Sequence, residues 1–78
     1  MANGLYNKLA GTVGSFIGEE KAKLAINRQL ERCGATPDNL TEKHLREVMN
    51  FLVGATTLYL YPDKAKQQEL TSILKALA

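Results

Sequence analysis

Apolar residues recur every three or four positions along most of this chain, the spacing of one face of an α-helix. Four segments show this spacing, and glycine or proline separates them. The pattern predicts helices over about residues 3–17, 19–33, 42–60 and 63–77. We therefore expect an all-α fold, a compact four-helix bundle forming one domain over residues 1–78. The bundle is either complete in one chain or completed by a homodimer.

The first segment has a stripe of large apolar residues at helical spacing. The stripe consists of Leu5, Leu9, Val13 and Phe16, and Tyr6, Ala10 and Ile17 widen it. Gly11 and Gly14 each weaken a helix by about 1 kcal/mol relative to alanine. Both glycines lie away from the centre of the stripe, so we do not expect them to mark a close helix–helix approach. The sequence leaves open whether this helix docks on the bundle or is free for a partner or a membrane surface.

The connector between the second and third segments carries the clearest signals for helix ends. Gly34 follows the last apolar position of the second segment. Many helices end at a residue in the left-handed conformation, and glycine adopts it most readily. Residues 36–39 read Thr-Pro-Asp-Asn, which is typical of a turn. Thr41 then suits an N-cap, and Leu40 and Leu45 have the spacing of a hydrophobic staple across the helix start.

The third segment is apolar around much of its circumference, which predicts a central helix or one shared with a partner. Phe51 and Leu58 fall on a flank of their own, seven residues apart. Residues 57–61 read Thr-Leu-Tyr-Leu-Tyr and could form a short strand. Because no second strand is available to pair with it, we expect helix there.

Composition narrows the possible classes of protein. A chain of 78 residues with 45% hydrophobic residues can form one small core, and such domains are marginally stable. Its net charge of +2 is unremarkable. Cys33 and His44 are the only residues of their kinds, so an internal disulfide and a cysteine-built zinc site are excluded. No stretch approaches the ~20 apolar residues of a membrane span, and no secretory signal precedes the first segment. We expect a cytoplasmic protein.

The residues with reactive side chains do not form a catalytic pattern. His44 lies on a polar shoulder without a nearby Asp, Cys or second His to complete a site. Cys33 lies on a buried face at a helix C-terminus, where the helix dipole disfavours a thiolate. The glycines at 11, 14 and 18 lack the Lys-Ser or Lys-Thr of a phosphate-binding loop. We therefore expect no enzyme activity, no cofactor and no metal.

Several large apolar or amphipathic side chains exceed what one small four-helix core needs. They are Leu24, Phe51, Leu58, Tyr59 and Tyr61. Tyrosine is enriched where one end of a side chain must remain wet, as at protein interfaces. We predict that these residues form a surface for another protein or a second copy of this chain, although they could also simply cap the core. The predicted function is a non-catalytic protein-interaction or regulatory module.

The alternative is a small nucleic-acid-binding protein that uses a basic face on the second and third helices. Its candidate residues are Lys21, Arg28, Arg32, Lys43 and Arg46. Glu20 and Glu31 interrupt this face, and the connector is longer than the turn of a helix-turn-helix motif. Nucleic acid is therefore the less favoured partner.

Overall fold

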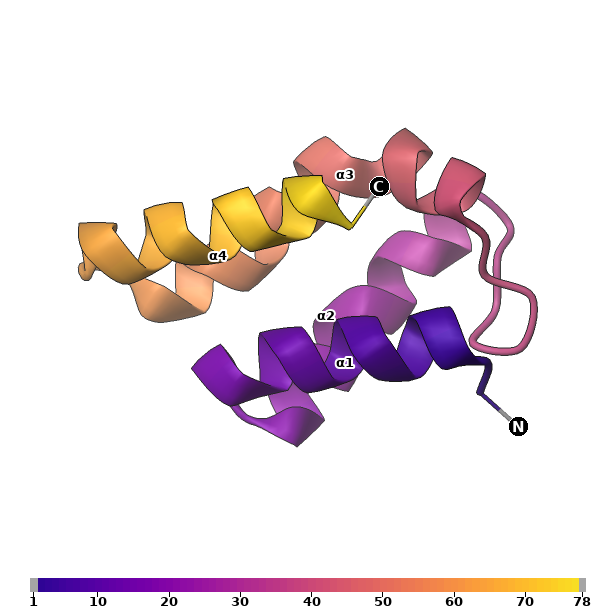
Figure 1. The fold of residues 1–78 in the computed structure, drawn as a ribbon, viewed down its shortest axis with the longest axis horizontal. Helices are drawn as coiled ribbons and strands as arrows, with labels where there is room; N and C mark the ends of the chain where they lie inside the picture. Colours follow the sequence, from indigo (N-terminus) through magenta and orange to yellow (C-terminus); the bar gives the residue numbers. More distant parts are fainter. Residues whose placement is uncertain (1, 78) are drawn as a thin grey trace.

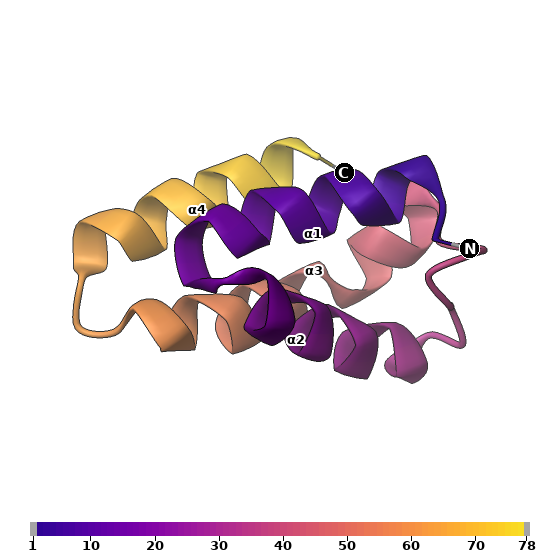
Figure 2. The ribbon, with the colours of Figure 1, turned by 90° about the horizontal axis from the view of Figure 1, so that it is seen from below.

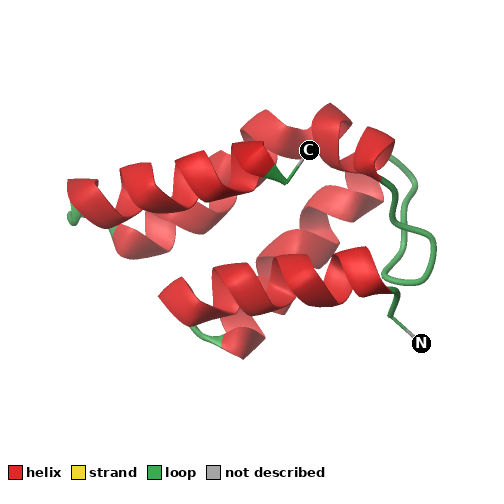
Figure 3. Cartoon of the chain, viewed as in Figure 1, coloured by secondary structure: helices red, strands yellow, loops and turns green. Residues whose placement is uncertain are grey.

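The computed structural model describes residues 2–77 and contains four α-helices and no strand within that range (Figure 1, Figure 3). The helices are α1 (Gly4–Ile17), α2 (Glu19–Arg32), α3 (Glu42–Thr57) and α4 (Lys64–Ala76), with a 3₁₀ helix, η1 (Leu58–Leu60), between α3 and α4. The predicted all-α, four-helix fold is confirmed. Residues 57–61, whose types also suit a strand, form none. They include η1, which continues α3 as a 3₁₀ helix.

The four helices form two layers. In Figures 1 and 2, α1 and α4 lie on one side of the molecule, and α2 and α3 lie on the other. The helices α1 and α3 each contact the other three. The accessible surface is 4782 Å². A compact monomer of this mass is expected to expose about 4,700 Å². The helices therefore close into a compact unit without a second chain.

The core is built from the predicted apolar stripes of all four helices. Its residues of at most 1% exposure are Leu9, Val13, Ala22, Ile26, Leu30, Leu45, Leu52, Leu70 and Leu74. The helix α1 contributes two of them and also buries Tyr6 and Ala10. The hydroxyl of Tyr6 donates a hydrogen bond to Asn27 Oδ1 in α2 at 2.8 Å. The described part of the first segment therefore docks on the bundle, which settles a question that the sequence left open.

Asn3 holds the start of α1 against the connector between α2 and α3. Its Oδ1 accepts the backbone N–H of Tyr6 at 2.9 Å, which caps α1. Its Nδ2 donates to the carbonyl of Leu40 at 2.8 Å, and its backbone N–H donates to the carbonyl of Pro37 at 2.8 Å. One side chain thus satisfies groups at a helix N-terminus and in a loop about 35 residues away.

Of the two glycines of α1 singled out from the sequence, Gly14 faces the start of α2, whereas an added Cβ atom at Gly11 has no neighbour within 4 Å. A Cβ atom added at Gly14 would lie 3.4 Å from the Cα atom of Glu19, the first residue of α2. Gly18, between the two helices, has a φ angle of +94°, a conformation that side chains disfavour. Gly18 therefore allows α2 to begin directly after the end of α1, and a Cβ atom at Gly14 would be in ordinary van der Waals contact with α2.

Both ends of the α2–α3 connector form as predicted. Gly34 has a φ angle of +75°, and its N–H donates to the carbonyl of Glu31 at 3.3 Å. The N–H of Ala35 donates to the carbonyl of Leu30 at 3.0 Å, which completes a Schellman motif. At the other end, Thr41 Oγ1 accepts the N–H of His44 at 3.3 Å and caps α3.

The start of α4 differs slightly from the prediction. Asp63 is the N-cap and not the first helical residue, because its Oδ1 accepts the backbone N–H of Lys66 at 3.1 Å. Pro62 precedes this cap and follows Tyr61 through a cis peptide bond. The turn therefore ends one residue later than the sequence indicated.

Candidate functional site

The five residues predicted to form an interface all lie at the surface. Their exposed fractions are 49% for Leu24, 54% for Phe51, 72% for Leu58, 45% for Tyr59 and 72% for Tyr61. They are the exposed large apolar side chains of the described chain. None of them belongs to the core cluster, so the interpretation that they cap the core does not account for them.

Two cation–π contacts across α2 and α3 bring most of these residues onto one side of the molecule. The guanidinium carbon of Arg32 lies 4.4 Å from the ring centroid of Phe51. The ammonium nitrogen of Lys21 lies 5.8 Å from the ring centroid of Tyr59. Exposed contacts of this kind contribute about 0.5–1 kcal/mol each, and the longer one is the weaker. They place the two ends of α2 beside the C-terminal half of α3 and η1.

Leu24 lies between these two cations along the sequence, about 60–80° round α2 from them, and it lines a hollow with Lys21 and Glu20. Phe51 and Leu58 are seven residues apart, so they lie within about 20° of each other around the axis of α3 and η1. We name this surface the α2–α3 face, and its members are Lys21, Leu24, Arg28, Arg32, Phe51, Leu58 and Tyr59. Tyr61 adjoins one end of this face, because its backbone N–H donates to the carbonyl of Leu58 at 3.2 Å.

Charges of both signs border the α2–α3 face, because the exposed Glu47 lies one turn before Phe51 on α3 and Glu20 lines a hollow with Lys21 and Leu24. Lys21, Arg28 and Arg32 lie within an arc of about 40° on α2, on the side toward α3. None of the three forms an ion pair with a carboxylate of residues 2–77. Glu20 and Glu31 lie about 60–120° further round α2 from these three bases and within about 40° of Leu24. Lys21, Arg28 and Arg32 are therefore without a carboxylate partner among residues 2–77, whereas Lys23 of the same helix pairs with Glu19.

The basic residues proposed for nucleic-acid binding do not form one continuous face. Lys43 and Arg46 lie about 80° and 140° around α3 from Phe51, which marks the side facing Arg32. The structure thus groups Lys21, Arg28 and Arg32 of α2 with the apolar residues. From the sequence, the basic residues suggested nucleic-acid binding and the apolar residues suggested protein binding. Both kinds of residue lie on one face because α2 and α3 pack antiparallel in a register that the sequence does not reveal.

The side chains of His44 and Cys33 both contribute to the fold: His44 caps a helix, and Cys33 packs against the core. The Nδ1 atom of His44 accepts the backbone N–H of Thr41 at 3.2 Å, which completes a capping box. A glutamate or glutamine usually fills this place, so the sequence analysis did not foresee it. Cys33 is partly buried against the core, and its thiol donates to the carbonyl of Leu30 at 3.4 Å. Within residues 2–77, no group of three or more His, Cys, Asp and Glu residues could hold a metal ion.

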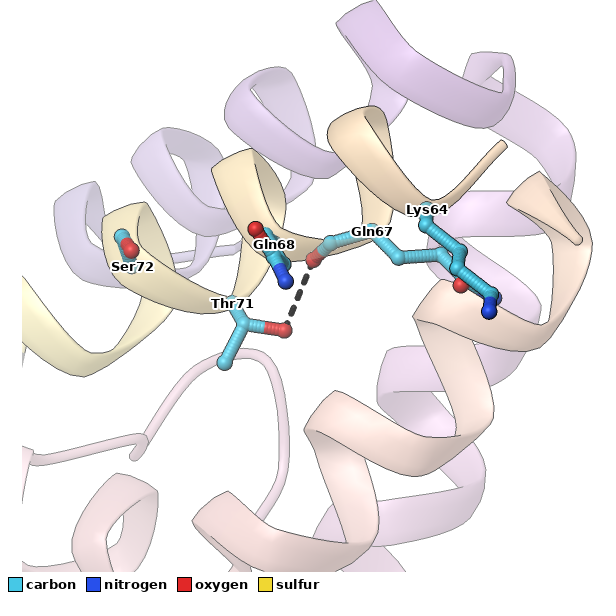
Figure 4. Close-up of a pocket in the computed structure, with 5 residues that line it drawn as sticks. All are labelled: Lys64, Gln67, Gln68, Thr71 and Ser72. Carbon is cyan, nitrogen blue, oxygen red and sulfur yellow. Dashed lines mark hydrogen bonds between the residues drawn. The ribbon is translucent and has the colours of Figure 1, made fainter. Parts of the chain in front are cut away.

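The hollow along α4 is shallow and polar. Figure 4 shows that its labelled side chains all come from this one helix. They are Lys64, Gln67, Gln68, Thr71 and Ser72. The Thr71 hydroxyl donates to the carbonyl of Gln67 at 2.8 Å, and Gln67 Nε2 donates to the carbonyl of Thr57 at 3.1 Å. The first bond lies within α4, the second joins α4 to the end of α3, and together they leave no convergent set of polar groups for a ligand.

A second hollow lies between α1 and α2, with an ion pair at its edge. The Nζ atom of Lys23 lies 2.8 Å from Oε1 of Glu19, one turn before it on α2. The hydrogen bond from Lys23, reinforced by its charge, lowers the pKa of the Glu19 carboxyl, and the same contact raises the pKa of Lys23. Both side chains are well solvated, so this pair contributes little to stability.

No helix within residues 2–77 has both the length and the apolar character needed to cross a membrane. The chain matches no protein-family model, and neither the curated proteins nor the solved structures give a significant match. The case for a function therefore depends on the geometry of the α2–α3 face.

Proposed function

We propose that this chain is a non-catalytic protein-interaction module that binds its partner through the α2–α3 face and the adjoining Tyr61. The observation that carries this proposal is the exposure of five large apolar side chains on an otherwise closed bundle. If a fully exposed side chain of this size offers roughly 200 Å², the five together expose roughly 600 Å². That is at the upper end for a monomer surface, and a standard interface buries roughly 800 Å² on each partner.

The kinds of residue on this face support the same proposal. Tyrosine, phenylalanine and arginine are the types that most often dominate the energy of protein interfaces. The face has two aromatic rings, each beside a cation from α2, and Tyr61 adds a third ring at its end. Exposed leucines between such anchors help to exclude water when a partner covers them.

The test compares two double variants in a pull-down from an extract of the protein's own cells. Phe51→Ser with Leu58→Ser removes the two exposed apolar groups of α3 and η1. Gln68→Ser with Lys75→Ala changes exposed residues of α4 and serves as the control. Both variants should keep the helical circular dichroism and thermal unfolding of the original chain. Only the first should lose proteins that the original chain captures.

Two results would contradict this proposal. Unfolding of the Phe51→Ser, Leu58→Ser variant would mean that these side chains belong to the core. Capture of the same proteins by that variant and by the original chain would mean that binding uses another surface. Quantitative mass spectrometry of the captured proteins decides the second point.

Nucleic-acid binding is the second candidate, and the cluster of Lys21, Arg28 and Arg32 favours it. Fluorescence anisotropy with labelled single-stranded and duplex probes, over a salt series, tests it directly. Phosphate contacts release counter-ions, so specific binding would weaken steeply as salt rises. Tight, salt-sensitive binding that depends on Lys21, Arg28 and Arg32 and is unaffected by Phe51→Ser with Leu58→Ser would favour this function over protein binding, whereas weak binding equal for all probes would count against it.

A further inference from the structure

The start of α1 contains an asparagine followed directly by a glycine, Asn3 and Gly4. Asparagine is a thermolabile residue, because the backbone nitrogen of the next residue can attack its side-chain carbon, Cγ. A side chain on that next residue hinders the approach, and glycine has none. The other four asparagines of the chain are followed by lysine, arginine, leucine and phenylalanine. Asn3 is therefore the asparagine most open to this reaction.

The reaction replaces the amide of Asn3 with a carboxylate. The nitrogen of Gly4 gives its proton to a base in the solvent and forms a bond to Cγ of Asn3. The bond from Cγ to Nδ2 then breaks, and Nδ2 takes up a proton and leaves as ammonia. Water opens the resulting succinimide ring at either carbonyl, which gives aspartate or isoaspartate. Water is the only co-reactant, and nothing is oxidised or reduced.

The folded structure restrains the side chain that must move in this reaction. Oδ1 of Asn3 accepts the backbone N–H of Tyr6 at 2.9 Å. Its Nδ2 donates to the carbonyls of Leu40 at 2.8 Å and of Asp38 at 3.2 Å. Figures 1 and 2 show the start of α1 beside the connector that supplies these two carbonyls. Ring closure turns Cγ toward the nitrogen of Gly4, so these bonds must first break.

We propose that Asn3 is a site of spontaneous deamidation, which docking of α1 suppresses and which, once it occurs, loosens α1 from the connector. Helix ends open at a lower free energy than the whole fold, and the reaction proceeds from that open state. The aspartate product still has an oxygen that can cap α1. It has no N–H donor for the carbonyls of Leu40 and Asp38, and it places a negative charge beside them. Isoaspartate also lengthens the backbone by one carbon atom at the cap.

Peptide mass spectrometry over a time course at mildly alkaline pH tests the site and its suppression. The whole chain is incubated in buffer and in concentrated urea, and conversion is measured at all five asparagines. Asn3 should convert fastest in urea, and about tenfold or more slowly in the folded chain. Gly4→Ala adds a Cβ atom that meets nothing within 4 Å, so this variant should fold and convert more slowly in urea.

Two results of the time course would overturn the proposal. Conversion at Asn3 that is no faster in urea than at the other four asparagines would overturn the site itself. Equal rates at Asn3 in the folded and unfolded chains would overturn the suppression by docking.

Urea unfolding of two variants with the same added charge tests the loosening of α1. Asn3→Asp reproduces the aspartate product, whereas Asn7→Asp changes an exposed residue of the same helix. Asn3→Asp should raise the equilibrium constant of unfolding about fivefold or more, because two hydrogen bonds to the connector are lost. Asn7→Asp should change it by less than about twofold. Equal stability of the two variants would overturn the loosening.

Discussion

At the scale of single residues, Gln29 is the clearest departure from a well-satisfied core. It lies in α2 with 8% of its surface exposed, and its Oε1 atom is the one buried side-chain acceptor of residues 2–77 without a hydrogen-bond partner. A buried group left unsatisfied costs about 1–3 kcal/mol, whereas an apolar group of the same shape does not incur that cost. We predict that Gln29→Met raises the free energy of unfolding by about 1 kcal/mol. Urea unfolding followed by circular dichroism measures this change.

The matched control for this substitution is Gln68→Met. Gln68 is an exposed residue of α4, where the same change should alter the free energy of unfolding by less than about 0.5 kcal/mol. If Gln29→Met instead destabilised the chain, the amide oxygen would have a partner in solution, such as a bound water molecule. The cost assigned to Gln29 would then be wrong.

At the scale of helices, two glycines should respond in opposite ways to alanine. Gly34 ends α2 with a φ angle of +75°, so a side chain there is strained. Gly54 lies inside α3, and a Cβ atom added to it has no neighbour within 4 Å. We predict that Gly34→Ala lowers the free energy of unfolding by about 1 kcal/mol. Gly54→Ala should raise it by about 0.5–1 kcal/mol.

Thermal or urea unfolding of the two glycine variants gives this comparison directly. Both substitutions add the same methyl group, so each serves as the control for the other. A stabilising Gly34→Ala would show that the Schellman motif does not form as described. A destabilising Gly54→Ala would show that this side of α3 is covered by something other than solvent.

The ion pair of α2 gives a pH-dependent prediction. The pKa of Glu19 is lowered, so its carboxylate favours the folded state above pH 4.5, its ordinary pKa, and loses this effect as the pH falls through the folded value. The pKa of Lys23 is raised, so its contribution is complete below pH 10.5 and is lost as the pH rises through the folded value. We predict that Lys23→Ala returns the pKa of Glu19 toward 4.5. An NMR titration of Glu19 measures it, and an unchanged pKa in Lys23→Ala would contradict the pairing.

Features that depend on neighbours along the chain could be predicted from the sequence. The end of α2 at Gly34 and the cap at Thr41 follow from residue type and position, because each bonds backbone within one turn. The exposure of Leu24 also follows, since it lies opposite the buried stripe of α2. These local rules gave the order of the helices and most of their ends.

Features that join distant segments could not be predicted. The bond from Asn3 to the carbonyl of Leu40 exists only after α1 docks beside the connector. The approach of Glu19 to Gly14 depends on the angle at Gly18, which periodicity does not report. The contact of Arg32 with Phe51 requires the register of two helices. Sequence reasoning therefore found the parts of the candidate site but not their arrangement on one face.

At the scale of the whole molecule, the charges of the α2–α3 face should control self-association. Two copies that meet through this face bring their cations together, and salt screens that repulsion. The screening length falls from about 10 Å at 0.1 M salt to about 3 Å at 1 M salt. We predict a monomer at roughly 0.1 M NaCl and detectable dimerisation at roughly 1 M NaCl. Light scattering over a concentration series measures the mass under both conditions.

A pair of charge-removing variants separates this effect from a general effect of salt. Arg28→Gln with Arg32→Gln removes two cations from the face. Lys43→Gln with Arg46→Gln removes two cations outside the face, about 80° and 140° round α3 from Phe51. Both lower the net charge equally, but only the first should strengthen self-association at low salt. A stable dimer of the original chain at low salt would assign the face to a second copy. The homodimer that the sequence left open would then occupy this face.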